Sequence, residues 1–102
     1  MIVKWTETAK ADLQAIWDYI ARDSVFYANK YVDELTSATD ILEDFPERGR
    51  AIPEIGDPNS REIIYGSYRI MYHISNENIF ITQVVHSARN FKPNPRLKGT
   101  TI

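Results

Sequence analysis

The strongest constraint on the fold lies in the second half of the chain, where three apolar runs follow one another with very short connections. The runs cover about 61–65, 68–74 and 79–86. Gly66-Ser67 separates the first two, a Ser-Asn-Glu-Asn turn separates the last two, and Gly66 suits the first central position of a type II′ turn. Strands joined this closely pair with their sequence neighbours, so the runs predict a three-stranded antiparallel meander.

The two turns also predict which side chains share a face of the sheet. Pairing Tyr65 with Tyr68, and Ile74 with Ile79, divides alternate residues into two sets. The predicted core face carries Ile63, Tyr65, Tyr68, Ile70, Tyr72, Ile74, Ile79, Ile81, Gln83 and Val85. The opposite face mixes polar and apolar side chains, which are Glu62, Ile64, Arg69, Met71, His73, Phe80, Thr82, Val84 and His86. A uniform register therefore places Arg69 and His86 on one face, as diagonal neighbours.

The first half of the chain predicts a short strand and two helices. Residues 1–5 are apolar and β-branched, and apolar residues then recur at helical spacing over about 7–22 and 25–45. Thr6 and Ser24 are the predicted N-caps. The short link makes the helices antiparallel neighbours that cover the core face. Residues 46–60 read as a loop with at most a short extended piece, and 92–102 as a basic tail of one 1–102 domain.

Composition limits the classes of function. The 102 residues suit a single α+β domain, and the chain contains no cysteine, which excludes disulfides and cysteine-ligated metals and fits a cytoplasmic location. No signal peptide or membrane-length apolar run is present in the sequence. Residues 1–47 carry ten acidic and four basic side chains, a net −6, whereas residues 48–102 carry four acidic and eight basic ones, a net +4. The basic half predicts an acidic partner.

An ordered set of motifs resembles the bacterial RelE/ParE superfamily of toxins, closer to its ParE-like members. The motifs are WTETAKADLQAIWDYI, a second helix ending in FPERG, REIIYGSYRIMYHI, and VVHSARN. They span nearly the whole chain. The resemblance implies a strand, a helical hairpin and an antiparallel sheet, which is the arrangement that the residues predict independently.

The resemblance also implies a type II toxin–antitoxin system and two alternative activities. RelE-like members cleave mRNA in the ribosome, whereas ParE-like members poison DNA gyrase and lack the nuclease site. Both kinds are neutralised by an antitoxin whose C-terminal segment wraps the toxin. The expected partners are therefore a cognate antitoxin and DNA gyrase, or the ribosome and mRNA in the alternative case. A homodimer and a toxin–antitoxin hetero-oligomer both remain open.

Ribonuclease chemistry needs a base for the ribose 2′-OH, cations for the phosphorane and an acid for the leaving oxygen. Four side chains are candidates for some of these roles, namely Arg61, Arg69, His86 and Arg89. The resemblance implies that RelE-like members often carry a tyrosine or histidine near the last strand. Here no tyrosine follows Tyr72, and Phe91 stands where such a member could carry the hydroxyl of a general acid. The sequence therefore favours a ParE-like toxin that acts by binding. A RelE-like ribonuclease, or an inactive relative that only binds its antitoxin, is the alternative.

A binding protein of this kind needs two surfaces. The mixed face of the sheet predicts the antitoxin-binding residues Ile64, Arg69, Met71, Phe80 and Val84. The basic end of the chain predicts the target-binding residues Arg89, Lys92, Arg96 and Lys98. The two histidines lack adjacent carboxylate ligands, and no glycine-rich phosphate loop is present, so no metal or cofactor is expected.

Overall fold

The computed structural model describes residues 1–87, and the predicted tail 92–102 lies outside this range. The predicted α+β order of a strand, a helical hairpin and an antiparallel meander is confirmed. The elements are β1 (Ile2–Trp5), α1 (Glu7–Ala21), α2 (Val25–Ser37), the 3₁₀ helix η1 (Asp40–Glu43), β2 (Arg50–Ala51), β3 (Ser60–Tyr65), β4 (Tyr68–Ser75) and β5 (Asn78–His86).

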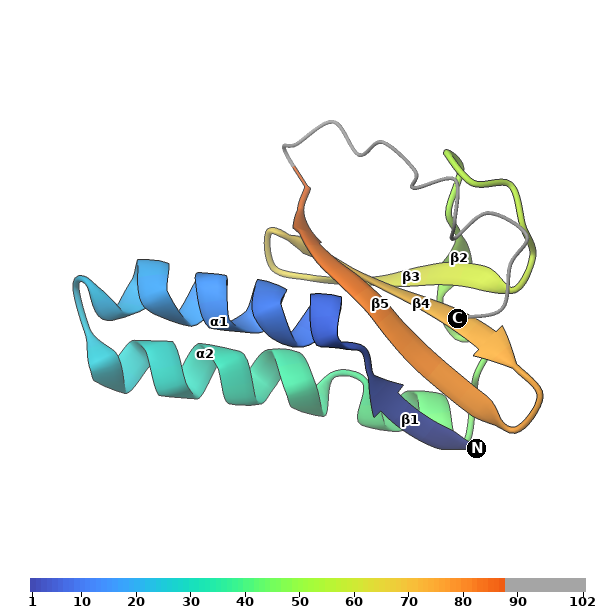
Figure 1. Ribbon diagram of the computed structural model, residues 1–102, viewed down its shortest axis with the longest axis horizontal. Helices are drawn as coiled ribbons and strands as arrows, with labels where there is room; N and C mark the ends of the chain where they lie inside the picture. Colours follow the sequence, from blue (N-terminus) through green and yellow to red (C-terminus); the bar gives the residue numbers. More distant parts are fainter. Residues whose placement is uncertain (88–102) are drawn as a thin grey trace.

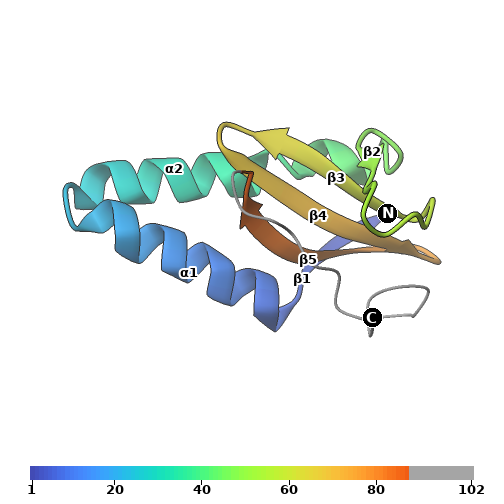
Figure 2. The ribbon, with the colours of Figure 1, turned by 90° about the horizontal axis from the view of Figure 1, so that it is seen from above.

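The strands form one sheet in the order β1-β5-β4-β3-β2. The two helices lie on one side of this sheet, and the loop between β2 and β3 lies on the other (Figures 1 and 2). The N-terminal strand pairs in parallel with β5, with Val3 beside Ile79 and Trp5 beside Ile81. No described helix is both long enough and apolar enough to span a membrane.

Local signals fix the start of each helix, as the sequence predicts. The Thr6 hydroxyl accepts a hydrogen bond from the Ala9 amide, and the Ser24 hydroxyl accepts one from the Tyr27 amide. The apolar stripes of the helices then close over the sheet. The resulting core contains Ala9, Ile16, Leu35, Leu42, Ile70, Tyr72, Ile79, Ile81 and Val84.

The second helix ends earlier than predicted. The expected helix over 25–45 stops at Ser37, and a separate 3₁₀ turn follows. The hydroxyl of Thr36 donates to the Val32 carbonyl, and that of Thr39 donates to the Thr36 carbonyl. Threonine hydroxyls that bond nearby carbonyls compete with the backbone ladder, which is the physical reason for a break at this point.

A β-bulge changes the register of the meander. The predicted pairs Tyr65–Tyr68 and Ile74–Ile79 are present, but the register shifts between Met71 and Tyr72. Tyr72 pairs with Ile81 and Met71 pairs with Gln83, so Thr82 is the extra residue. A one-residue shift exchanges the two faces of a strand, and it places Val84 in the core where a uniform register would bury Gln83.

Candidate functional site

The bulge separates the side chains that the sequence placed together. Arg69 pairs with Val85 on the face away from the helices, whereas His86 pairs with Tyr68 on the helix side. The prediction that Arg69 and His86 share a face is therefore wrong. The physical reason is the extra residue Thr82, which reverses the orientation of every later side chain in β5.

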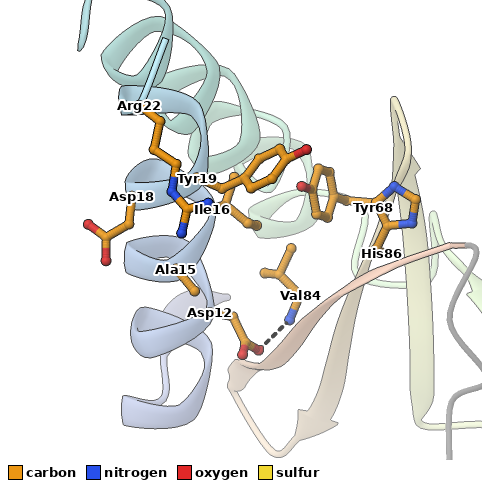
Figure 3. A pocket seen from close by; sticks show the side chains of 9 residues that line it. All are labelled: Asp12, Ala15, Ile16, Asp18, Tyr19, Arg22, Tyr68, Val84 and His86. Atoms are coloured by element: carbon orange, nitrogen blue, oxygen red, sulfur yellow. Dashed lines mark hydrogen bonds between the residues drawn. The ribbon is translucent and has the colours of Figure 1, made fainter. Parts of the chain in front are cut away.

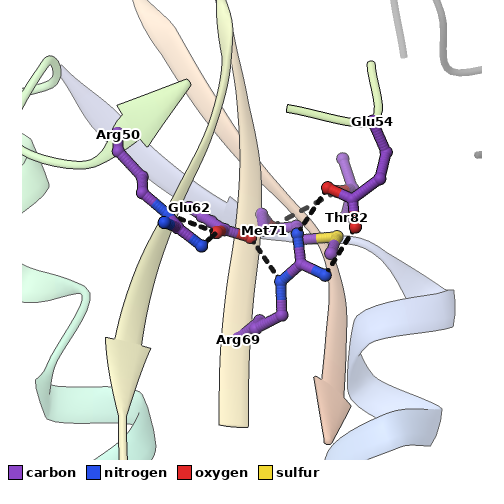
Figure 4. A network of polar contacts seen from close by, with 6 residues as sticks. All are labelled: Arg50, Glu54, Glu62, Arg69, Met71 and Thr82. Atoms are coloured by element: carbon purple, nitrogen blue, oxygen red, sulfur yellow. Dashed lines mark hydrogen bonds and ion pairs between the residues drawn. The ribbon is translucent and has the colours of Figure 1, made fainter. Parts of the chain in front are cut away.

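A buried ion-pair network surrounds Arg69 (Figure 4). Its Nε donates to Glu62 Oε1 at 2.6 Å, and its two terminal nitrogens donate to the Glu54 carboxylate, each at 2.9 Å. Arg50 Nε donates to the other Glu62 oxygen at 2.7 Å. The Glu62 side chain is fully buried and that of Arg69 is 9% exposed. Two carboxylates thus neutralise the Arg69 guanidinium.

The electrostatics of the network follow from these hydrogen bonds. The hydrogen bonds that Arg69 donates to Glu54, with further contributions from Glu62, hold the pKa of Arg69 above its usual value. Reciprocally, the hydrogen bond from Arg69 lowers the pKa of Glu54 below its ordinary value of 4.5. Arg69 is therefore permanently charged and Glu54 is ionised at neutral pH.

The loop that carries Glu54 covers part of the sheet. Ile52 and Ile55 pack on Met71 and Val85, so Met71 is only 1% exposed. Val84 lies in the core on the other face. The expectation that Ile64, Arg69, Met71, Phe80 and Val84 form one exposed surface is therefore corrected. Ile64 is 54% exposed and Phe80 is half-buried. Antitoxin contact by these residues stays a prediction.

A cleft of about 600 Å³ opens on the helix side, between α1 and the ends of β4 and β5 (Figure 3). The His86 ring lies edge-on to the Tyr68 ring, with their centroids 5.3 Å apart. Asp12 Oδ2 accepts the Val84 amide at 2.9 Å, which ties β5 to α1 just beyond the bulge. Tyr19 and Arg22 line the outer part of this helix–sheet cleft and form a cation–π contact.

The remaining candidate residues occupy separate places. Arg61 donates to the Gly49 carbonyl at 2.8 Å and so holds the loop before β2. The His73 ring shares a buried hydrogen bond of 3.0 Å with Ser60 Oγ. The predicted target-binding residues Arg89, Lys92, Arg96 and Lys98 lie outside the described range. Within residues 1–87, no group of three His, Asp or Glu side chains is arranged to hold a metal.

Two acidic residues that hold the two faces of the sheet were not predicted from the sequence, namely Glu54 and Asp12. Glu54 lies in a loop without periodicity, where an acidic residue is ordinarily solvated, so nothing local indicates its partner. Asp12 lies beside the apolar stripe of α1, three residues after Ala9 and four before Ile16, and this position was the available signal that it meets the sheet. For an ion pair, the available signal was Arg69 on the core-opposite face of β4, as a diagonal neighbour of Glu62 on β3, whose direct partner is Met71.

Acidification tests the Glu54–Arg69 contact. Because folding lowers the pKa of Glu54, its contribution to stability is fully present above pH 4.5 and is lost as the pH falls through the lowered value. We expect the melting temperature of Glu54→Gln to lie below that of wild type at neutral pH and to converge with it in acid. Calorimetric scans between about pH 7 and pH 3 measure this convergence.

Glu7→Gln is the control for that experiment. Glu7 pairs with Lys10 at 3.3 Å, but its side chain is 92% exposed, and an exposed ion pair contributes little. We therefore expect its melting curve to follow wild type at every pH. A Glu54→Gln difference that stays constant down to about pH 3 would show that the lost contact is not governed by titration of this carboxylate.

Comparisons with known proteins agree with this architecture. The model of the family described as "ParE toxin of type II toxin-antitoxin system, parDE" matches residues 3–91. A toxin of Caulobacter vibrioides named RelE2 is 36% identical over 88 residues, which cover 85% of this chain and 96% of the relative. A structure of the chromosomal ParDE system from P. aeruginosa superposes with a TM-score of 0.70 at 25% identity, over 84% of this chain and 95% of that one.

The family match covers nearly the whole chain, and the alignment with the RelE2 toxin covers 85% of it. The structural neighbour has the same order of strand, helical hairpin and antiparallel sheet. The chain therefore belongs to the family of ParE toxins of type II toxin–antitoxin systems, within the RelE/ParE superfamily.

Proposed function

We propose that this toxin acts by binding DNA gyrase and blocking supercoiling, and that a cognate antitoxin neutralises it. The observation that carries a binding mechanism is the separation of the candidate nuclease groups. Arg69 lies on one face of the sheet between two carboxylates, and His86 lies on the other face against Tyr68. A base and a cation on opposite faces cannot meet at one phosphodiester.

The hydrogen bonds of Arg61 and Arg69, the two candidate cations among the described residues, support the same mechanism. Phosphorane stabilisation needs guanidinium N–H groups aimed at the reacting phosphate. Arg61 instead donates to a loop carbonyl, and the three charged nitrogens of Arg69 donate to Glu54 and Glu62. Gyrase as the proposed target is supported by the match to the ParE family, and the basic C-terminal residues are proposed to contact it.

The test is supercoiling by gyrase in the presence of purified toxin. We expect wild type to inhibit, and a triple variant with glutamine at Lys92, Arg96 and Lys98 to inhibit at least about tenfold less, since each charge contact contributes to association. The matched control has glutamine at Lys4, Lys10 and Lys30. It removes the same charge from exposed positions of the first half and should inhibit like wild type.

Primer extension on translated mRNA tests the alternative function, which is cleavage of mRNA by a RelE-like ribonuclease. We expect no toxin-dependent cleavage sites with wild type. Discrete cleavage that disappears in His86→Gln, with supercoiling untouched, would contradict the gyrase proposal and establish a RelE-like ribonuclease. No effect in either assay, together with intact antitoxin binding, would identify a relative that only binds its antitoxin.

A further inference from the structure

A second hollow, of about 340 Å³, lies at the edge of the sheet beside β3. Its wall has three parts. They are the edge of β3, the segment from the end of α2 to η1, and the residues just before β2. We call it the edge notch, and its principal residues are Ala38, Ile41, Arg48, Arg50, Ile63 and Ile64. It is separate from the helix–sheet cleft, and it borders the Arg69 network through Arg50 and Glu62, which belong to both.

The notch exists because β2 is very short. β2 pairs with β3 only at Glu62 and Arg61, so among the described residues no strand pairs with Ile63–Tyr65 on the edge opposite β4. The Ser60 carbonyl accepts a hydrogen bond from the Ile52 amide, so the backbone groups of Ser60 and of every second residue after it point toward the β2 side of β3. Because strand backbone groups alternate in direction, the N–H and C=O of Ile64 point into the notch. An unpaired edge of this kind is a template for another strand.

The side chains around the edge add apolar contact and positive charge. Ile64 is 54% exposed and Ile41 is 39% exposed, although both are large apolar residues. Arg48 is exposed, and the Arg50 side chain is 64% exposed. The one carboxylate in the lining, Glu62, is fully buried and already bonded to two arginines. Arg48, together with the exposed part of the Arg50 side chain that is bonded to Glu62, therefore gives the rim its positive charge.

We propose that an extended segment of the cognate antitoxin adds as a strand beside Ile64, with an acidic side chain toward Arg48 and Arg50 and an apolar one over Ile64 and Ile41. The inference rests on the antitoxin pairing of the proposed function and assigns it a location. Backbone hydrogen bonds supply affinity in such strand addition, and alternate side chains supply specificity.

Charge argues against the other occupants of the edge. Two copies paired edge to edge through β3 would bring their Arg48 and Arg50 side chains together, and like charges across an interface are unfavourable. The chain's own residues 88–102 contain four basic and no acidic side chains, so they do not complement the rim either. An acidic segment from a different protein fits both the charge and the open backbone.

The test measures binding of the full-length toxin to the antitoxin encoded in its own operon. We expect Ile64→Lys to weaken affinity about 10–100-fold and Arg48→Glu about tenfold by calorimetry. Val25→Lys and Lys30→Glu are the matched controls and should leave affinity unchanged. Val25 is also 54% exposed, and Lys30 is an exposed cation, but both lie on α2 far from the notch. Circular dichroism verifies that each variant is folded.

Hydrogen exchange supplies the readout that is specific to a strand. Complex formation should slow exchange of the Ile64 amide at least about tenfold, because strand addition gives that N–H a partner. Unchanged affinity in both notch variants, or an unprotected Ile64 amide, would overturn the proposal. A toxin dimer that Ile64→Lys dissociates in sedimentation would also overturn it, in favour of self-pairing. Failure of wild type to inhibit gyrase would contradict only the proposed target.

Discussion

Replacing Arg69 with methionine is expected to destabilise the protein by about 3–5 kcal/mol, because it leaves a buried carboxylate without its closest partner. Glu62 Oε1 receives its 2.6 Å hydrogen bond from Arg69, and the Glu62 side chain has no solvent exposure. The variant also releases Glu54 and, with it, the loop that places Ile52 over Met71. Urea denaturation measures the loss.

Arg50→Met is the matched control for this prediction. Arg50 bonds the same carboxylate at 2.7 Å, but its side chain is 64% exposed and Glu62 keeps its bond to Arg69, so the expected loss is clearly smaller than that of Arg69→Met. The double variant with methionine at Glu62 and Arg69 should lose less than the sum of the single variants, because it removes the buried charge as well. Equal losses for Arg50→Met and Arg69→Met would contradict a buried network centred on Arg69.

Loss of stability in an Arg69 variant can itself reduce toxicity. Loss of activity in an Arg69 variant is the expected result for a nuclease residue and also for a structural ion pair. The two cases differ in stability, since a group that only contacts substrate leaves the urea midpoint unchanged. Activity of Arg69→Met should therefore be compared with the folded fraction at the same temperature.

The second large effect is expected for Gly49→Ala, which should cost about 2–4 kcal/mol through overpacking and a strained hydrogen bond. A Cβ atom at this position would lie 2.5 Å from the Glu62 carbonyl oxygen and 2.7 Å from the Tyr72 hydroxyl. That hydroxyl accepts the Gly49 amide at 2.9 Å and donates to the Pro46 carbonyl at 2.7 Å. The loop before β2 has no room to move without breaking both bonds.

Gly56→Ala separates this steric cost from the conformational cost of losing a glycine. Gly56 has a φ of +74°, and a Cβ atom added there would meet no other atom within 4 Å, so only the left-handed backbone penalty of about 1 kcal/mol applies. Thermal unfolding of the two variants should therefore rank Gly49→Ala well below Gly56→Ala. The reverse order would mean that the Tyr72 contact is not the constraint on this loop.

Elements that depend on neighbours in the chain could be predicted from the amino-acid sequence. The caps at Thr6 and Ser24, the antiparallel meander and the pairs nearest each turn all follow from local chemistry and period. Alternation also placed Arg69 correctly opposite the helices, because β3 and β4 run without a shift from Tyr65 to Ser60. The superfamily was likewise evident from the ordered motifs, which the family match confirms.

Two features could not be predicted from the sequence. They are the point in β5 at which the side chains exchange faces of the sheet, and the carboxylates that neutralise Arg69. The bulge at Thr82 exchanges Gln83 for Val84 in the core, and the Val84 amide then bonds Asp12 of a distant helix. Glu54 reaches Arg69 because Ile52 and Ile55 bury their side chains on the sheet. Both features depend on contacts between segments that are distant in the chain: which apolar side chain fills the core, and which carboxylate lies nearest to Arg69. The alternation of side chains along a single strand contains no information about such contacts.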